Sequence, residues 1–174
     1  VTIRLSFIKN PQGFQFLGVF FLYQIKGKKI MCGIFLYKGQ KQDWDSLEND
    51  INRIGYRGPD NTHHEMIGND VLFAFHRLAI MGTTEMGDQP MKHPNDASLT
   101  LICNGEIYNY KYLADKYCFN LVTGSDCEII LLMFKKFGIE KTVKELDGVF
   151  MFVIHEANTG LLFAGRDPMG VRPG

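Results

Sequence analysis

The stretch Met31-Cys32-Gly33-Ile34-Phe35 decides how the rest of this sequence is interpreted, because it places a cysteine directly behind the first methionine. If translation starts at Met31 and that methionine is removed, Cys32 carries both a thiol and a free α-amine. The amine titrates near ~8 and the thiol near ~8.5, so at neutral pH the amine can accept the thiol proton without a histidine. The stretch then predicts a nucleophile with its own base. The simpler alternative is that Cys32 is a small apolar residue opening a strand.

Length and composition are those of one globular domain. The chain has 174 residues, of which 45% are hydrophobic and 22% charged, enough to build a sizeable core. Its 19 Lys and Arg balance 19 Asp and Glu, so the formal net charge is zero. Charge therefore gives no reason to expect a nucleic acid or a membrane as partner.

The four cysteines, Cys32, Cys103, Cys118 and Cys127, form no Cys-x-x-Cys pair. A domain this large does not need disulfides, so we expect reduced thiols in a reducing compartment, which for this chain means the cytoplasm. No histidine sits at ligand spacing from a cysteine. We therefore assign no metal to the chain.

Residues 1–30 differ from the rest, since they open with Val and are poor in acidic side chains. Their apolar part, residues 14–23, is too short to span a bilayer, which needs ~20 residues. It lacks the cleavage site of a signal peptide. We expect a leader that is untranslated or removed, with a genuine propeptide as the alternative, and a domain over residues 31–174.

The first half of that domain mixes strands and helices. Residues 34–37 form an apolar strand, and apolar positions at helical spacing predict a helix from Asp43 until Gly55 stops the pattern. Residues 56–60 are a loop, and residues 71–80 a buried strand that carries Arg77. Residues 82–95 follow as a long loop with two prolines.

The second half continues in the same manner. Residues 99–103 form a strand that runs into Asn104-Gly105, which is typical of a tight turn. Residues 109–117 suit a helix, and Ser125-Asp126-Cys127-Glu128 is a capping box that opens a helix reaching Gly138. A shorter helix over 139–146 and a hairpin of residues 149–154 and 161–164 complete the domain. Strands and helices without regular alternation predict an α+β fold.

Four features of these segments suit one pocket. Cys32 is a candidate nucleophile, and Asn104-Gly105 can aim a side-chain amide and a backbone N–H at one point. Arg77 can hold a carboxylate through two parallel hydrogen bonds, and Asp126 can face an ammonium. Taken singly, the turn is only a turn, Asp126 favours the helix dipole, and Arg77 pairs with an acid such as Glu106. Together they predict a pocket for an α-amino acid with an acyl carbon over a thiol.

At this point the sequence resembles the glutamine amidotransferases with an N-terminal cysteine nucleophile, and among them the glutaminase domain of glutamine-hydrolysing asparagine synthetases. The segments that carry the resemblance occur in the family's order over nearly all of residues 31–174. They are Met31-Cys32-Gly33-Ile34, Arg57-Gly58-Pro59-Asp60, His76-Arg77-Leu78-Ala79-Ile80, Gln89-Pro90, Asn104-Gly105-Glu106-Ile107-Tyr108-Asn109, Ser125-Asp126-Cys127-Glu128, Leu146-Asp147-Gly148 and Arg166-Asp167-Pro168-Met169-Gly170-Val171-Arg172-Pro173.

The resemblance implies an N-terminal nucleophile hydrolase fold, an αββα sandwich of two antiparallel sheets. It implies that Cys32 attacks the side-chain amide of glutamine and that Asn104 and Gly105 form the oxyanion hole. Arg77 would bind the substrate carboxylate, and Glu106 and Asp126 its α-ammonium. Residues Leu78, Ala79, Ile80 and Met81 would line the same pocket.

Two departures from the family's pattern limit what is assigned. Its synthetases continue into a domain that activates aspartate with ATP, and the Ser-Gly-Gly-x-Asp-Ser loop of that domain has no counterpart here. We therefore assign no cofactor to this chain and expect ATP and Mg only in a synthetase domain, in cis beyond Gly174 or in trans. The second departure is the leader, which would turn the amine of Cys32 into an amide.

Three functions remain open at this point. The leading one is a glutaminase whose ammonia serves asparagine synthesis, with glutamine as substrate and a second copy of the chain as a candidate partner. The next is the glutaminase domain of another amidotransferase, and the third is a non-catalytic module that binds glutamine or a protein. The complete set of nucleophile, oxyanion, carboxylate and ammonium residues favours an enzyme.

Overall fold

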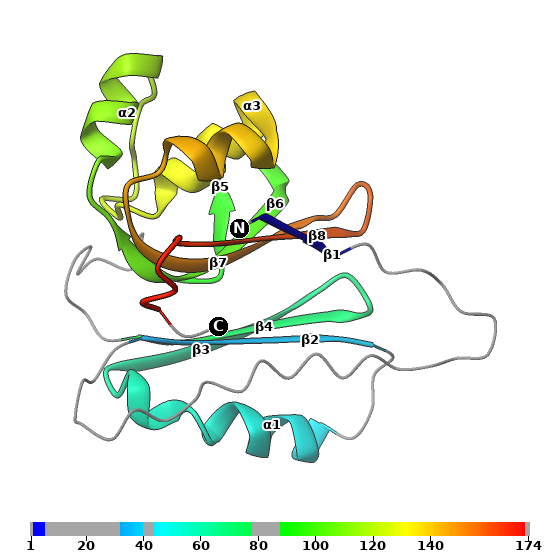
Figure 1. Cartoon of the computed structure of the whole chain (residues 1–174). Helices are drawn as coiled ribbons and strands as arrows, with labels where there is room; N and C mark the ends of the chain where they lie inside the picture. The colour runs from blue at the N-terminus through cyan, green and yellow to red at the C-terminus, as the bar shows by residue number, and fades with distance from the viewer. Residues whose placement is uncertain (1, 6–31, 40–43, 78–87, 173–174) are drawn as a thin grey trace.

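The computed structural model describes residues 2–5, 32–39, 44–77 and 88–172, which form four layers (Figure 1). Two antiparallel sheets lie face to face, one with the strand order β1-β8-β7-β6-β5 and the other with the order β2-β4-β3. The strands are β1 (Thr2–Leu5), β2 (Gly33–Lys38), β3 (Asn61–Ile67), β4 (Val71–Arg77), β5 (Met91–His93), β6 (Asp96–Ile107), β7 (Gly148–Glu156) and β8 (Leu161–Arg166). The helices are α1 (Trp44–Asn52), α2 (Tyr110–Tyr117) and α3 (Glu128–Glu145).

Three apolar clusters hold the layers together. Helix α1 covers the outer face of the three-stranded sheet through Leu47 and Ile51, and α2 and α3 cover the outer face of the five-stranded sheet. The third cluster fills the space between the sheets, which we call the interlayer. It contains Ile34, Leu36, Ile67, Val71, Phe73 and Phe75 from one sheet and Ile102, Met151, Val153, Leu162 and Ala164 from the other. This arrangement confirms the predicted α+β class and its αββα layers.

Period-two alternation explains why both faces of the small sheet are covered. In β2, Ile34 and Leu36 point into the interlayer, whereas Phe35 and Tyr37 point to α1. Successive side chains of a strand lie on opposite faces, so an uninterrupted apolar run supplies both contacts. Burial of both faces of β2 shields its backbone hydrogen bonds from water.

The strand predictions need three corrections. The structure has a strand, β3, over residues 61–67, which the sequence analysis missed because its first four residues are exposed and polar. The predicted loop over 82–95 contains β5, while residues 78–87 lie outside the described part. The predicted turn at Asn104-Gly105 is wrong, since both residues lie inside the twelve-residue strand β6.

The helix predictions hold in outline. Helix α1 ends at Asn52, before Gly55, and a 3-10 turn over Gly55–Arg57 follows, which overlaps the start of the predicted loop over residues 56–60. The capping box is wrong, because Glu128 binds the N–H groups of Val122 and Thr123. The predicted break at Gly138 is present as a kink within α3, where that glycine has φ +75°.

Strand β1 lies within the predicted leader. It pairs antiparallel with β8, with Thr2 opposite Gly165 and Leu5 opposite Leu162. The remainder of residues 1–30 lies outside the described part of the chain. Among the helices that the structure describes, none has the length and apolar character needed to cross a membrane.

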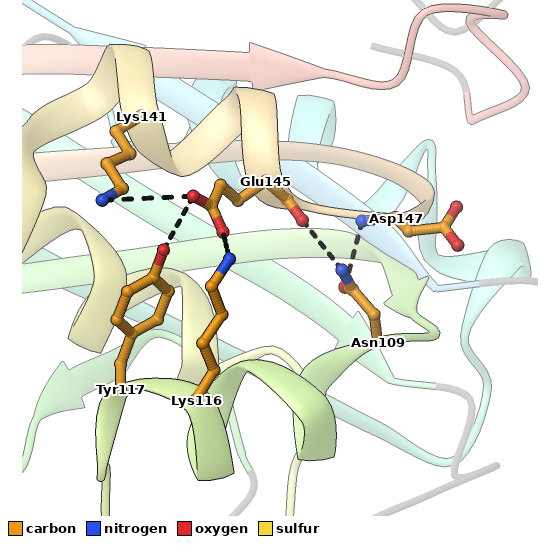
Figure 2. Close-up of polar contacts among 6 residues, drawn as sticks. All are labelled: Asn109, Lys116, Tyr117, Lys141, Glu145 and Asp147. Carbon is orange, nitrogen blue, oxygen red and sulfur yellow. Dashed lines mark hydrogen bonds and ion pairs between the residues drawn. The ribbon is translucent and has the colours of Figure 1, made fainter.

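A polar network fixes α2 and α3 to the connection before β7 (Figure 2). The carboxylate of Glu145 accepts hydrogen bonds from Lys116 Nζ at 2.8 Å and Tyr117 Oη at 2.7 Å. The Asn109 amide donates to the Glu145 carbonyl at 2.8 Å and accepts from the N–H of Asp147 at 3.0 Å. One side chain thereby satisfies the Glu145 carbonyl, which lacks a partner within α3, and the N–H of Asp147 just beyond the helix.

The Asn109 bridge can be tested by truncation. Asn109→Ala removes a partly buried and an exposed hydrogen bond to backbone groups, so we expect the free energy of unfolding to fall by about 1–2 kcal/mol. Urea unfolding measures this loss. Asn120→Ala, at an exposed position, is the control and should change stability little. Equal losses in the two variants would contradict a structural role for the bridge.

Candidate active site

Cys32 and Arg77 lie next to each other at the end of two paired strands. Gly33 pairs with His76, so the next pair along the register is Cys32 with Arg77. Cys32 packs against the interlayer cluster. Arg77 has the same strand parity as Phe73 and is buried, which places its side chain on the interlayer face as well.

Asn104 faces the same layer from the opposite sheet. It follows Ile102, an interlayer residue, by two positions in β6, so both side chains lie on one face. Strands β2 and β6 are in contact across this layer. The predicted nucleophile and the predicted oxyanion residue therefore point into one space from two sheets.

The dipeptide Asp88-Gln89 shows that these groups share one end of the interlayer. Asp88 forms an ion pair with Arg77 at the end of β4. Gln89, the next residue, hydrogen-bonds the backbone of Cys103 in β6, directly before Asn104. Because consecutive residues reach both strands, the strand segments that carry Cys32, Arg77 and Asn104 lie close together.

The Asn104 side chain is only 2% exposed, and its Nδ2 atom has no hydrogen-bond acceptor among the described residues. A buried amide without a partner costs stability, about 1–3 kcal/mol for a lost hydrogen bond. An unpaired buried donor of this kind is available to bind a ligand. This donor faces the layer that holds the Cys32 thiol.

Gly105 is required by the close approach of β7. A Cβ atom there would lie 2.5 Å from the Val149 carbonyl oxygen and 2.6 Å from Phe150 Cα. Gly105 is opposite Phe150, whose own N–H and C=O groups both bind Asp167. The pair is thus a non-hydrogen-bonded one, so the N–H of Gly105 points away from β7 toward the other edge of β6.

Asp126 and Glu106 lie at the same end of β6 and already have partners. The Asp126 carboxylate accepts the N–H of Ile107 at 2.6 Å, and burial raises its pKa. Glu106 pairs with Arg172 at 2.8 Å. The alternative that Arg77 pairs with an acid is confirmed, but the acid is Asp88 and the example given, Glu106, is wrong. Residues Leu78, Ala79, Ile80 and Met81 lie outside the described part.

Arg57 is a site residue to which the sequence analysis gave no role. Its Nε donates to the Cys32 carbonyl oxygen at 3.3 Å, and its Nη2 is buried without a hydrogen-bond partner among the described residues. The contact holds the backbone at the nucleophile. An arginine before Gly-Pro was visible in the sequence, but no spacing rule links it to a residue 25 positions away.

His76 supports the site from the opposite face of β4. Its Nε2 lies 2.8 Å from the carbonyl of Ile51, and its Nδ1 lies 2.8 Å from Thr62 Oγ1. It thereby ties β4 to α1 and β3 directly beside Arg77. Burial lowers the pKa of the His76 imidazole. Elsewhere in the described ranges, no three His, Cys, Asp or Glu side chains gather in a way that could hold a metal.

A thiol at a strand end, opposite a buried amide donor, defines the class of this site as one suited to acyl transfer through a cysteine. The chain belongs to the glutamine amidotransferase domain family, which it matches over residues 31–173.

Named relatives agree with that family. A probable asparagine synthetase (glutamine-hydrolyzing) of Acanthamoeba polyphaga mimivirus is 44% identical over 149 residues, covering 82% of this chain and 27% of that protein. Asparagine synthetases (glutamine-hydrolyzing) of Rattus norvegicus and Homo sapiens are each 39% identical over 145 residues, covering 82% of this chain and 26% of theirs. The chain thus spans about a quarter of the length of these relatives.

The buried histidines give the fold a predictable response to acid. Burial lowers the pKa of His76, His93 and His155, so each favours the neutral form when folded. Below the ordinary histidine pKa of ~6.5, the unfolded chain binds protons that the folded chain does not. Asp126 acts in the opposite direction, because its pKa is raised. We expect the urea concentration at the midpoint of unfolding to decrease as the pH is lowered from ~7.5 to ~5.5.

His155 isolates one part of this response. Its Nδ1 is buried without a partner in the described structure, so His155→Leu removes a proton site at little cost in hydrogen bonds. The variant should lose less stability than the parent over the same pH interval. An equal or larger loss would show that His155 does not contribute to the linkage.

Proposed function

We propose that this domain hydrolyses the side-chain amide of glutamine to glutamate and ammonia, with Cys32 as the nucleophile. The observation that carries the proposal is the buried Nδ2 of Asn104, which has no acceptor among the described residues and faces the layer of the Cys32 thiol. An oxyanion that forms on the substrate would supply the missing acceptor.

The reaction would proceed in two balanced steps. In the first, the thiol proton moves to the α-amine of Cys32, the sulfur bonds to the amide carbon, and the C–N bond breaks as ammonia takes up the proton. In the second, water attacks the glutamyl thioester, glutamate leaves and the thiol is restored. In both steps the negative charge on the carbonyl oxygen would be met by Asn104 Nδ2 and the N–H of Gly105, donors each worth about 3 kcal/mol in comparable sites.

Substrate recognition would use the charged groups at the same end of the interlayer. Arg77 suits the α-carboxylate through its planar pair of donors. Because Asp88 already contacts Arg77, the substrate would share that arginine with Asp88 or displace it. Asp126 and Glu106 would bind the α-ammonium, with Leu78, Ala79, Ile80 and Met81 lining the pocket.

The fate of the ammonia is inferred from the relatives. Those named above are glutamine-hydrolyzing asparagine synthetases, which supports asparagine formation from aspartate as the use of the ammonia. We propose that a synthetase domain, in cis or in trans, carries out that step with ATP and Mg. The glutaminase step requires neither.

The role of the Cys32 amine can be tested by changing the N-terminus. A chain that starts at Met31 and loses that methionine should hydrolyse glutamine, whereas one that keeps residues 1–30 should not. The reason is that a peptide nitrogen is not a base near neutral pH. Ammonia release measures both chains, and mass spectrometry verifies each N-terminus. Equal rates with an intact leader would refute the N-terminal base.

The oxyanion assignment can be tested at Asn104. Asn104→Ala should lower kcat by roughly 10²-fold or more with a smaller effect on KM, because the donor acts mainly in the transition state. Asn104→Asp keeps nearly the same shape but presents acceptors where a donor is needed, and it should turn over equally poorly. Near-normal kcat in the Asp variant would remove Asn104 from the oxyanion hole.

A further inference from the structure

On the edge of β6 that faces β5, backbone pairing ends just before the proposed oxyanion residues Asn104 and Gly105. Strand β5 pairs with β6 only as far as Met91 opposite Leu101. Beyond that pair, within the described residues, side chains take the place of a neighbouring strand. The residues concerned are Cys103, Gly105 and Ile107. Their backbone N–H groups point to this edge, because the backbone N–H groups of the even-numbered residues of β6 point to β7.

Gln89 covers the first of these positions. Its side chain is 5% exposed, and its amide makes both hydrogen bonds that a strand would make to Cys103. The Oε1 atom accepts the Cys103 N–H at 2.5 Å, and Nε2 donates to the Cys103 carbonyl at 3.1 Å. The residue held in this way is the immediate neighbour of Asn104.

Asp126 covers the third position by accepting the N–H of Ile107. Gly105 lies between these two side-chain contacts. A backbone strand at this edge would cover the N–H of Gly105 together with its neighbours. Two separate side chains instead fix Cys103 and Ile107, and among the described residues neither of them binds the N–H of Gly105.

We propose that Gln89 is a positioning residue for the oxyanion hole. It holds the backbone at Cys103 so that the Asn104 amide and the Gly105 N–H keep a common aim at the substrate oxygen. The inference rests on the proposed function. Misplacement of a reacting group by about 1 Å can cost 10²-fold in rate, so a residue that touches no substrate can control turnover.

The first test is Gln89→Met, which keeps the length of the side chain and removes both hydrogen bonds. We expect kcat for glutamine hydrolysis to fall roughly tenfold to a hundredfold while KM stays within about twofold. Thr142→Val is the matched control, because Thr142 is also a buried residue whose side chain donates a hydrogen bond to a backbone carbonyl, that of Gly138 at 2.8 Å. The control should lose stability and keep its kcat.

Amide hydrogen exchange gives a readout that is independent of activity. The Cys103 N–H should exchange faster in Gln89→Met than in the parent, and it should be unchanged in Thr142→Val. Slow exchange at Cys103 in Gln89→Met would show that the glutamine does not hold this backbone, and the inference would be wrong.

Gln89→Glu serves as a second variant of nearly the same shape, should the Met variant fail to fold. Its ionised carboxylate can accept the Cys103 N–H but cannot donate to the Cys103 carbonyl, whereas the protonated form can do both. The ratio of its kcat to that of the parent, measured at the same pH, should therefore rise as the pH is lowered. A ratio that stays constant or falls with acidification contradicts the inference.

Parallel assays of Asn104→Ala separate this inference from the proposed function. If Asn104→Ala is slow while both Gln89 variants keep normal kcat, the positioning role falls and the oxyanion assignment stands. If Asn104→Ala itself keeps normal kcat, both fall together. If substitutions at both Asn104 and Gln89 lower kcat without raising KM, and Thr142→Val leaves kcat unchanged, the positioning role is supported.

Discussion

The face-to-face packing of two antiparallel sheets is the constraint on which the rest of this structure depends. The apolar interlayer forces β2, β4 and β6 to present alternate residues to one common space. Cys32, Arg77 and Asn104 continue the same alternation past the last apolar residues. The site is thus the polar end of the hydrophobic layer, and its geometry follows from strand register.

The polar side chains at the end of the interlayer differ in whether they have hydrogen-bond partners. Arg77, Glu106 and Asp126 have charged or backbone partners. The Asn104 Nδ2 atom has no acceptor among the described residues, although the residue is almost fully buried. Buried polar groups are normally paired, so the Asn104 donor differs from the paired groups around it.

Side chains also replace backbone at the strand edge nearest the site. Gln89 and Asp126 each satisfy a β6 residue that a longer β5 would have paired. Ending a strand early at a functional edge leaves room for a ligand, and the remaining backbone groups still need partners. Asp167 has a similar role on the other edge of β7. Its side chain accepts the N–H of Phe150, and its backbone N–H donates to the Phe150 carbonyl.

The sequence by itself determined the α+β class, the core strands, the Gly138 break and the motif residues, because periodicity and glycine act over short distances. The sequence patterns did not reveal β3, because its first four residues are polar and exposed. They predicted a turn at Asn104-Gly105, where pairing with β7 overrides the turn propensity. Only the tertiary structure decided that Asp88 is the acid beside Arg77, that Arg57 holds Cys32, and that Gln89 holds Cys103. These contacts join residues that are adjacent in space and far apart in sequence, which no local pattern encodes.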